Sequence, residues 1–327
     1  MENKIRSKSI VHMNAWRLHD YGGIGAMRLK EISRPTPKKG EVLVRLLAAA
    51  TNPFDWYMAE GMIAKWEINL PITLGRDGAG IVEELGEGVT EFKVGEAVYG
   101  QADPAEDGTF AEYAVFRADR LMRKPESLSF AEASALPNTL YAAWNALFST
   151  KTGMDLQPGQ SVLIHGAGGG IGSLALQLAK WRGAHVIAVA APKHENLLRD
   201  LGADQFIDYT HQRFEEEVID RVDGVVDTIC AEPASKSYSI LKPGGMYVSL
   251  LRTPDQNEAK AKGVRAILTF GPDSYPATNE IEAAVAAGAV RPIVDKVYPL
   301  AQAPTALIEL KTGNGIGKIV LKINESI

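Results

Sequence analysis

The sequence predicts an α/β protein in which a doubly wound parallel sheet interrupts a second, strand-rich domain. Short apolar runs alternate with helix-type patterns from about residue 160 to residue 270, which is typical of βαβ units and of a sheet covered on both faces. Strand patterns dominate the first third and return in the tail from about Ala289, so we expect these two parts to form one domain. A chain of 327 residues is long enough for two domains of ordinary size.

Composition limits the possible partners. An apolar content of 46% and a charged content of 23% are those of a soluble globular protein. The net charge of −5 favours neither nucleic acid nor an anionic membrane surface, and no apolar run is long enough for a signal peptide or a membrane span. The single cysteine excludes an intramolecular disulfide and a thiolate-rich zinc cluster. We therefore expect a soluble, cytoplasmic protein without nucleic-acid or membrane partners.

In the first third, β-type runs bounded by glycine or proline predict strands, and the helical pattern that follows begins at Ser129 as N-cap and is broken by Pro137. The expected strands are 41–50, 78–86, 97–100 and 111–116. In the alternating region the expected strands are 161–166, 185–190, 205–209, 224–229, 246–251 and 265–270, and the expected helices are 171–183, 195–202, 213–221 and 235–241. The tail adds strands at 296–300 and 318–323 around one helix.

A glycine-rich turn, AGGGIG, occupies residues 167–172, after a predicted strand and at the start of a predicted helix. It matches G-x-G-x-x-G, with Ala167 in the first place. Gly169 lets the backbone approach a pyrophosphate, and Gly172 lets helix and strand pack closely. The N–H groups of the helix start, at Gly170 and Ile171, offer positive potential to phosphates. Such a turn can also serve packing alone, but strand, turn, helix and second strand together favour a dinucleotide.

The end of the second strand indicates which dinucleotide. Enzymes that use NAD place an Asp or Glu there, about 20 residues after the turn, to bind the ribose 2′-hydroxyl. This sequence has Ala190 and Ala191 instead, followed by Lys193 and His194, and Tyr209 after the third strand can reach the same corner. A cation and two hydrogen-bond donors suit a 2′-phosphate, so we expect NADPH. The alternative is that Lys193 and His194 are solvated residues of a helix start.

Several stretches in this order and spacing resemble the zinc-independent quinone oxidoreductase branch of the medium-chain dehydrogenase/reductase superfamily, which includes zeta-crystallin-like proteins. The stretches are TNPFDWYMAEG, LPITLGRDGAGIVEELGEGV, DGTFAEY, SALPNTLYAAWNAL, the glycine turn, LGADQFIDY, LKPGGMYVSL and GKIVLKI. The resemblance implies a GroES-like distorted β-barrel catalytic domain, interrupted by a Rossmann domain, with the active site in the cleft between them. We expect the barrel at residues 1–130 and 289–327 and the NADP(H)-binding domain at residues 131–288.

The same resemblance argues against metal catalysis. Zinc enzymes of this superfamily bind the catalytic ion through a Cys in the first of these motifs and a Gly-His-Glu in the second. Here the first motif offers Asn52, and the second reads Gly75-Arg76-Asp77. The six histidines show no i, i+4 pair and no H-E-x-x-H. We expect no metal.

Without a Lewis acid, the expected reaction is hydride transfer from NADPH to a quinone or to the β-carbon of an α,β-unsaturated carbonyl. The resemblance places Asn52 and Tyr57 in the cleft beside the nicotinamide. Asn52 then holds the cofactor or the substrate carbonyl, and Tyr57 donates a hydrogen bond or a proton to the substrate oxygen. Solvent can supply the proton equally well, and Asn52 and Asp55 can instead simply cap the following helix.

The resemblance also assigns Thr139, Cys230, Leu250 and Lys318 to the cofactor site. The family usually carries a Thr before Ala-Trp where this chain has Ala142, so Thr139 or Asn138 takes over that contact or the contact is lost. Cys230 falls near the nicotinamide ribose, although core burial is its other interpretation. For Lys318 the alternative is an ordinary surface lysine.

Three further expectations complete the prediction. Aromatic and thioether side chains after the first motif would suit a flat, lipophilic substrate, although ordinary core is the alternative; they are Trp56, Tyr57, Met58, Met62 and Trp66. The last strand of the parallel sheet, Arg265–Phe270, leaves an unpaired edge, and relatives cover it by forming a homodimer. A different class of function, an NADPH-binding protein with a structural or regulatory role, also stays open.

Overall fold

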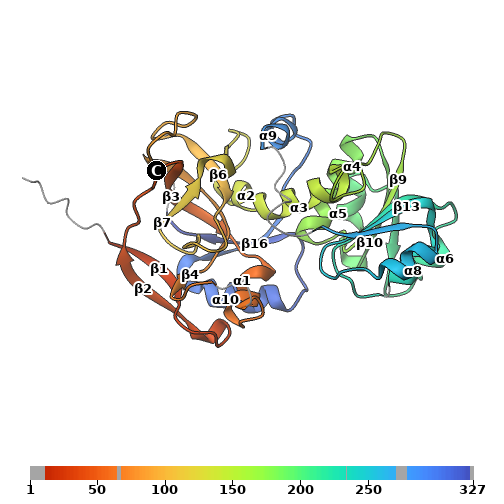
Figure 1. The fold of residues 1–327 in the computed structure, drawn as a ribbon, viewed down its shortest axis with the longest axis horizontal. Coiled ribbons are helices and arrows are strands. Elements are labelled where there is room, and N and C mark those ends of the chain that lie inside the picture. Colours follow the sequence, from red (N-terminus) through yellow and green to blue (C-terminus); the bar gives the residue numbers. More distant parts are fainter. Residues whose placement is uncertain (1–11, 65–67, 233, 270–277, 325–327) are drawn as a thin grey trace, which may run out of the picture. The chain divides into compact units, whose positions relative to one another are not determined.

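The computed structural model describes residues 12–64, 68–232, 234–269 and 278–324. The chain divides into two compact units, which we call the parallel-sheet unit and the strand-rich unit (Figure 1). The parallel-sheet unit comprises Ala135–Asp295 and Gly315–Lys318. The strand-rich unit comprises the residues up to Ser134, Lys296–Asn314 and the residues from Ile319 onward. The segment 315–318 thus groups with the parallel-sheet unit, whereas the sequence analysis assigned it to the other domain.

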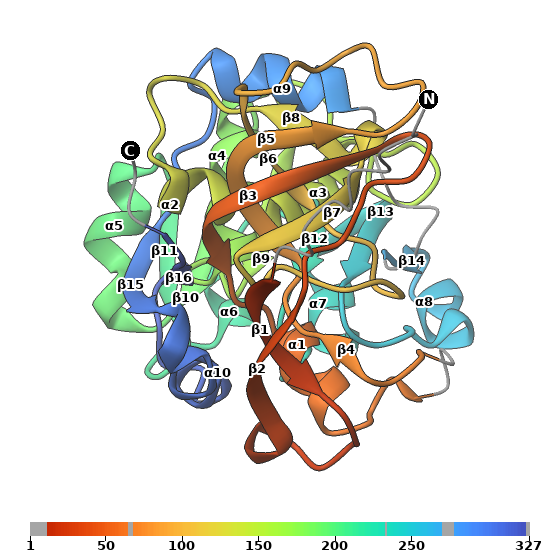
Figure 2. The same ribbon diagram turned by 90° about the vertical axis from the view of Figure 1, so that its left-hand side faces the viewer.

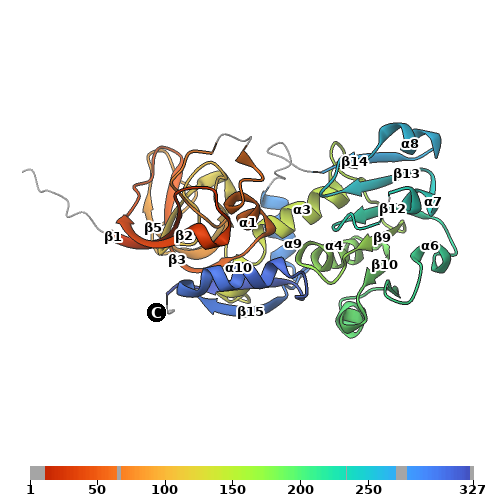
Figure 3. The same cartoon turned by 90° about the horizontal axis from the view of Figure 1, so that it is seen from below.

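The parallel-sheet unit has six strands in the order β11-β10-β9-β12-β13-β14, all parallel. The strands are β9 (Ser161–His165), β10 (His185–Ala190), β11 (Gln205–Asp208), β12 (Val222–Asp227), β13 (Leu241–Ser249) and β14 (Arg265–Leu268). The helices are α3 (Pro137–Phe148), α4 (Gly170–Trp181), α5 (Glu195–Asp200), α6 (Phe214–Glu217), α7 (Ala234–Ser239), α8 (Gln256–Ala261) and α9 (Thr278–Ala286). Figure 3 shows α4 on one side of the sheet and α7 and α8 on the other. This strand order, 3-2-1-4-5-6 in chain order, confirms the doubly wound fold.

The central strands of this sheet are apolar on both faces because helices cover both. Leu163 on β9, Ile187 on β10 and Val225 on β12 are at most 4% exposed and belong to one buried cluster. A residue that is buried on either face gains from an apolar side chain, so these strands read as continuous apolar runs rather than as alternating ones. This is why the sequence predicted each of the six strands.

The strand-rich unit is built mainly around β3 (Glu41–Ala50), which lies next to β5 and β7 (Figure 2). Its larger sheet has the order β15-β16-β3-β5-β6-β8, with β7 paired to β3, and a smaller sheet has the order β2-β1-β4. The other strands are β1 (His12–Leu18), β2 (Met27–Ser33), β4 (Ile72–Thr73), β5 (Asp77–Leu85), β6 (Ala97–Gln101), β7 (Tyr113–Arg117), β8 (Leu121–Arg123), β15 (Val294–Pro299) and β16 (Lys318–Lys322). Its helices are α1 (Pro53–Ala59), α2 (Phe130–Ser134) and α10 (Ala303–Lys311).

The predicted helix signals at residues 129–148 are confirmed in detail. The Ser129 hydroxyl accepts a hydrogen bond from the Glu132 N–H at 3.2 Å, and the Glu132 carboxylate accepts one from the Ser129 N–H at 2.8 Å, which is a capping box. Pro137 then begins α3, since proline fits the first turn of a helix but not its interior.

One predicted helix is shorter than expected. The pattern at residues 213–221 forms only α6, which ends at Glu217. Val218 turns to an extended backbone and packs into the buried cluster, while Ile219 is 93% exposed. The chain thus leaves the helix at the residue that packs into the core. Within the described ranges, no helix is long and apolar enough to cross a membrane.

Candidate functional site

The glycine turn joins β9 to α4, and its last glycine is fixed by packing. A Cβ on Gly172 would lie 2.2 Å from the carbonyl oxygen of Gly166 and 2.7 Å from the Cα of Ala167. Because both neighbours are backbone atoms, they cannot move aside. Only glycine fits there, as the sequence analysis expected of the residue that lets the helix pack closely on the strand.

The start of α4 is left open. Gly169 is the N-cap, no side chain among the described residues caps the helix, and its first turn contains no acidic residue. A Cβ on Gly169 would meet only the Gly166 oxygen, at an ordinary 3.4 Å, so packing inside the protein does not require this glycine. The N–H groups at Gly170 and Ile171 therefore keep their positive potential, and this helix start can bind an anion.

Two of the predicted side chains meet at Gly170. A Cβ there would lie 3.0 Å from Cδ of Lys318 and 3.1 Å from the Cγ2 methyl carbon of Thr139. Lys318 is 5% exposed, so the alternative of an ordinary surface lysine is wrong. The Thr139 hydroxyl donates to carbonyls of its own helix segment, at Ala135 and Leu136, and its methyl group is the part that faces Gly170.

The strand β10 ends without an acid, and the acid paired with its last residue on β11 already accepts hydrogen bonds. Ala190, the last residue of β10, is 3% exposed and pairs with Asp208 at the end of β11. Asp208 accepts hydrogen bonds from the N–H and the hydroxyl of Thr210, at 2.9 Å and 2.6 Å, and its carboxylate lies 2.9 Å from Nδ1 of His211. The hydrogen bonds from the Thr210 hydroxyl and from His211 lower the pKa of Asp208. The sequence analysis did not identify Asp208 as a residue of this corner. Tyr209, the neighbouring predicted residue, is 58% exposed.

His194 lies against the glycine turn. A Cβ on Gly168 would fall 1.9 Å from its Nδ1, and the side chain is buried. Neither ring nitrogen has a hydrogen-bond partner in the described part of the chain. Burial lowers the pKa of His194, and the charge of Lys193 lowers it further, against an opposing effect of Asp295. The alternative of a solvated helix start therefore describes the exposed Lys193 but is wrong for His194.

A buried acid organises the ends of β12 and β13. The Asp227 carboxylate accepts hydrogen bonds from the Cys230 N–H at 2.7 Å and from the Tyr247 hydroxyl at 2.8 Å, while its carbonyl accepts one from the Leu250 N–H at 3.1 Å. Cys230 has a φ of +52°, which is unusual for a residue with a side chain, and its sulfur lies 3.2 Å from the Ser249 hydroxyl. Burial, followed by the Asp227 charge, raises the pKa of Tyr247. Cys230 and Leu250, both 5% exposed, thus both bond to Asp227, and their contact with the coenzyme stays a prediction.

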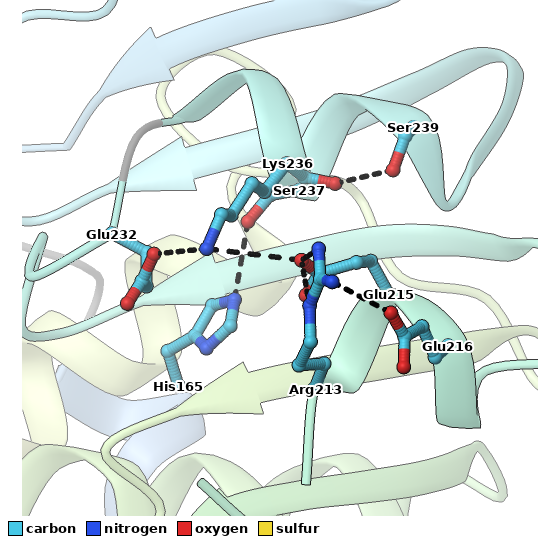
Figure 4. Close-up of polar contacts among 8 residues, drawn as sticks. All are labelled: His165, Arg213, Glu215, Glu216, Glu232, Lys236, Ser237 and Ser239. Atoms are coloured by element: carbon cyan, nitrogen blue, oxygen red, sulfur yellow. Dashed lines mark hydrogen bonds and ion pairs between the residues drawn. The ribbon is translucent and has the colours of Figure 1, made fainter.

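Polar contacts also anchor the strand end that precedes the glycine turn (Figure 4). Nε2 of His165, the last residue of β9, lies 3.1 Å from the Ser237 hydroxyl on α7. Lys236 pairs with Glu232 at 2.6 Å and with Glu215 of α6 at 3.7 Å. Burial lowers the pKa of His165. The contacts hold α6, α7 and β9 together where the turn begins.

In the strand-rich unit, Asn52 serves the local structure. It is 1% exposed and is the N-cap of α1, where its backbone N–H donates to the Asp55 carboxylate at 2.7 Å. Its side-chain Nδ2 donates to the Asp77 carboxylate on β5 at 3.0 Å. The hydrogen bond joins the two motifs through which the resembling zinc enzymes bind metal. A carboxyl or amide oxygen can bind a metal, but the amide nitrogen of Asn52 is a donor and cannot.

Tyr57 is half-buried on α1, and its ring packs edge-on against Trp56 with centroids 4.1 Å apart. Its hydroxyl has no hydrogen-bond partner among residues whose structure is described. The proposed wall for a lipophilic substrate is partly ordinary core, because Met58 is 3% exposed within a buried cluster. Met62 is 60% exposed, and Trp66 lies outside the described residues.

Sequence reasoning missed how the segment 315–318 reaches the glycine turn. The Gly317 N–H donates to the Gly168 carbonyl at 3.0 Å, and Gly317 forms a parallel bridge with Gly169. A Cβ on Gly317, whose φ is +71°, would lie 2.3 Å from the Ile293 carbonyl oxygen. The glycines of GNGIGK were the available signal for such a close backbone approach.

Within the described ranges, no group of three or more His, Cys, Asp or Glu could hold a metal ion.

Two family models match the chain. The alcohol dehydrogenase GroES-like domain matches residues 38–126, and the family described as zinc-binding dehydrogenase matches residues 201–321. The NAD(P)H oxidoreductase RTN4IP1, mitochondrial, of Danio rerio is 32% identical over 355 residues, which cover 96% of this chain and 92% of the relative. The NADPH-dependent alkenal/one oxidoreductase, chloroplastic, of Arabidopsis thaliana is 32% identical over 320 residues, or 94% of this chain and 79% of the relative. A solved quinone oxidoreductase from Coxiella burnetii has a TM-score of 0.84 and 31% identity, covering 96% of this chain and all of that chain (100%).

Proposed function

This chain belongs to the quinone oxidoreductase branch of the medium-chain dehydrogenase/reductase superfamily, and we propose that it transfers hydride from NADPH to a quinone or to the β-carbon of an α,β-unsaturated carbonyl. The observation that carries the proposal is the open start of α4 behind a glycine turn whose packing excludes any side chain at Gly172. A helix start without its own acidic or capping group is suited to a pyrophosphate.

The residues at this turn fit a dinucleotide. Gly169, Gly170 and Ile171 would hold the pyrophosphate through their N–H groups, and Ala167 and Gly172 keep the turn compact. Thr139 and Lys318 border the same helix start, while Cys230 and Leu250 border the ends of β12 and β13. We assign the last four residues to the nicotinamide half of the coenzyme.

The choice of NADPH over NADH follows from the other end of the site. Ala190 leaves space where an acid would bind a 2′-hydroxyl, and Lys193, His194 and Tyr209 would bind a 2′-phosphate. The buried, unpartnered ring nitrogens of His194 support this assignment, because the phosphate supplies the acceptors that the protein lacks there. The name of the Arabidopsis thaliana relative, which specifies NADPH, agrees with it.

The coenzyme supplies the hydride, and the protein supplies orientation and stabilises the negative charge that develops on the substrate oxygen. We assign the hydrogen bond to that oxygen to Tyr57, whose hydroxyl has no partner in the described part of the molecule. Asn52 is a positioning residue in this proposal, because its side chain donates to Asp77 and its backbone is held by Asp55. That same Asn52–Asp77 hydrogen bond supports a reaction without metal.

Assembly and location are further parts of the proposal. Among the described residues, β14 pairs only with β13, so Arg265–Leu268 presents a free strand edge that a second copy can cover. Phe270, the last residue of the predicted edge, lies outside the described residues. We propose a homodimer, which sedimentation at micromolar concentration tests. The cytoplasmic location stays a prediction, which fractionation of cells tests, and some relatives are named as mitochondrial or chloroplastic.

The test of the proposed function is a turnover assay with the purified chain. We expect steady NADPH consumption with at least one class among quinones, enones and enals, and slower consumption of NADH. Tyr57→Phe should lower kcat/KM by about tenfold, the loss of one hydrogen bond to a charged oxygen, without changing NADPH affinity. Tyr113→Phe, in the same unit, serves as the matched control. Tight NADPH binding without turnover on any acceptor would instead favour a structural or regulatory role.

A further inference from the structure

One buried side chain at the coenzyme turn has no hydrogen bond. His194 is 8% exposed, and both of its ring nitrogens lack a partner among the described residues. A neutral imidazole always carries one N–H donor, and leaving such a donor buried and unbonded costs free energy. The arrangement is therefore complete only when something else supplies an acceptor.

The surroundings hold this ring against the turn. A Cβ on Gly168 would lie 1.9 Å from Nδ1 and 2.6 Å from Cε1 of His194. The imidazole thus fills the space that a side chain at residue 168 would need. The Gly168 carbonyl is held in turn by the Gly317 N–H. His194 ends the 3₁₀ turn Pro192–His194 that follows β10, which is the corner where the 2′-phosphate of the coenzyme would bind.

Burial is the main cause that lowers the pKa of His194, and the two nearby charges act in opposite directions. Lys193 precedes it on the same turn, the charge of Asp295 on β15 also acts on it, and the glycine turn contributes no charged side chain. Burial and Lys193 disfavour a second proton on the ring, and Asp295 favours it. A phosphate dianion beside the ring would add a far stronger preference for the protonated form.

We propose that His194 makes coenzyme choice depend on pH: its imidazole takes up one proton from solvent when the 2′-phosphate of NADPH binds. The protonated ring donates from one nitrogen to a phosphate oxygen. Affinity for NADPH then falls as pH rises, while affinity for NADH does not change. The inference rests on the proposed function, since it requires that the chain binds NADPH.

Calorimetric titration with adenosine 2′,5′-bisphosphate and with adenosine 5′-monophosphate tests the proposal without turnover. Measurements between pH 6 and pH 8.5, in two buffers of different ionisation enthalpy, count the protons taken up. For the wild type we expect uptake approaching one proton with the bisphosphate, an affinity that falls about tenfold over this range, and no pH dependence with the monophosphate. Titration of the phosphate itself, near pH 6, is common to all variants and cancels in the comparison.

His194→Gln keeps a donor but cannot be protonated. We expect it to lose the proton uptake and to bind the bisphosphate about tenfold more weakly than the wild type at pH 6.5, and within about twofold at pH 8.5. His185→Gln removes an exposed histidine from the opposite end of β10 and should change neither quantity. If His194→Gln does not fold, the C2–H resonance of the wild-type ring serves instead, and its titration should move to higher pH when the bisphosphate is added.

The outcomes separate the two proposals. Equal proton uptake in the wild type and in His194→Gln, or a C2–H resonance that the bisphosphate does not shift, overturns the role of His194 and leaves the proposed function standing. If the wild type binds the bisphosphate no more tightly than the monophosphate at any pH, the assignment of NADPH itself is wrong.

Discussion

The two helices that follow a motif of the resembling family begin in opposite ways. At the start of α1, Asn52 is the N-cap, the Asp55 carboxylate accepts its N–H at 2.7 Å, and Pro53 fills the first position. At the start of α4, a glycine is the N-cap, no described side chain caps the helix, and the first turn contains no acid. Both helix starts carry the same positive end of a helix dipole.

The difference indicates which helix start is capped by the chain itself and which is available to a bound anion. At α1 the chain supplies its own carboxylate, so no site remains for an external anion. At α4 no described side chain caps the helix, so its first N–H groups stay available to an anion, and an anion that binds there stabilises the folded protein. A glycine turn in front of α4 adds space for that anion.

The largest expected effect is at Gly172. Gly172→Ala places a Cβ 2.2 Å from a backbone oxygen, which should lower the free energy of unfolding by about 3 kcal/mol and abolish NADPH binding. Gly169→Ala is the matched control. Its Cβ meets nothing closer than 3.4 Å, so stability should change by less than about 0.5 kcal/mol while NADPH affinity falls at least tenfold. Urea unfolding and calorimetry measure the two quantities, and a Gly169→Ala variant with full affinity would show that α4 is not the pyrophosphate site.

A smaller effect of the opposite kind is expected at α1. Asn52→Ala removes the side-chain nitrogen that donates to the Asp77 carboxylate at 3.0 Å. We expect the free energy of unfolding to fall by about 1–2 kcal/mol, with NADPH affinity unchanged. Asp55→Ala, which removes the carboxylate that accepts the Asn52 N–H, should cost about 1 kcal/mol. Reduced NADPH affinity in Asn52→Ala at unchanged stability would mean that Asn52 contacts the coenzyme, as the sequence first suggested.

The contrast between α1 and α4 also shows what could be predicted from the sequence. Gly172, the missing acid at Ala190 and the capping role of Asp55 are local features, because each depends on residues within one strand, turn or helix. The six parallel strands were predicted for the same reason, since burial on both faces leaves a continuous apolar run. The early end of α6 was not predicted, because it depends on where the core accepts Val218.

Contacts between distant segments could not be predicted. The burial of Lys318 and the position of His194 against Gly168 join segments far apart in the sequence, and they depend on the path of the chain after β15 and after β10. The sequence identified the residue types that suit a phosphate but not which of them would be buried. It predicted Lys193 as the cation and His194 as a hydrogen-bond donor of one phosphate site, but not that Lys193 is exposed and His194 is buried.

The C-terminal end of α4 differs from its N-terminal end, and substitutions there should have the smallest effect on stability. There the chain supplies its own counter-charge: Lys180, in the last turn, lies 2.8 Å from the Asp204 carboxylate, which also accepts the Val186 N–H at 2.7 Å. Burial opposes ionisation of Asp204, but these two hydrogen bonds outweigh it and lower its pKa. A carboxyl group with a lowered pKa in the folded protein stabilises it above its ordinary pKa, near 4, and this contribution is lost as pH falls through the lowered value.

Asp204→Asn should therefore lower the free energy of unfolding by about 1 kcal/mol at pH 7, with the difference from the wild type vanishing as pH falls through the lowered pKa of Asp204. Glu195→Gln, which removes an exposed i, i+4 pair with Arg199, should change it by only about 0.3 kcal/mol. Denaturant unfolding across this pH range measures both. A deficit of Asp204→Asn that persists unchanged at acid pH would mean that the carboxylate charge is not what holds this end of α4. Neither substitution should change NADPH affinity relative to the wild type at the same pH, because the coenzyme would bind at the opposite end of α4.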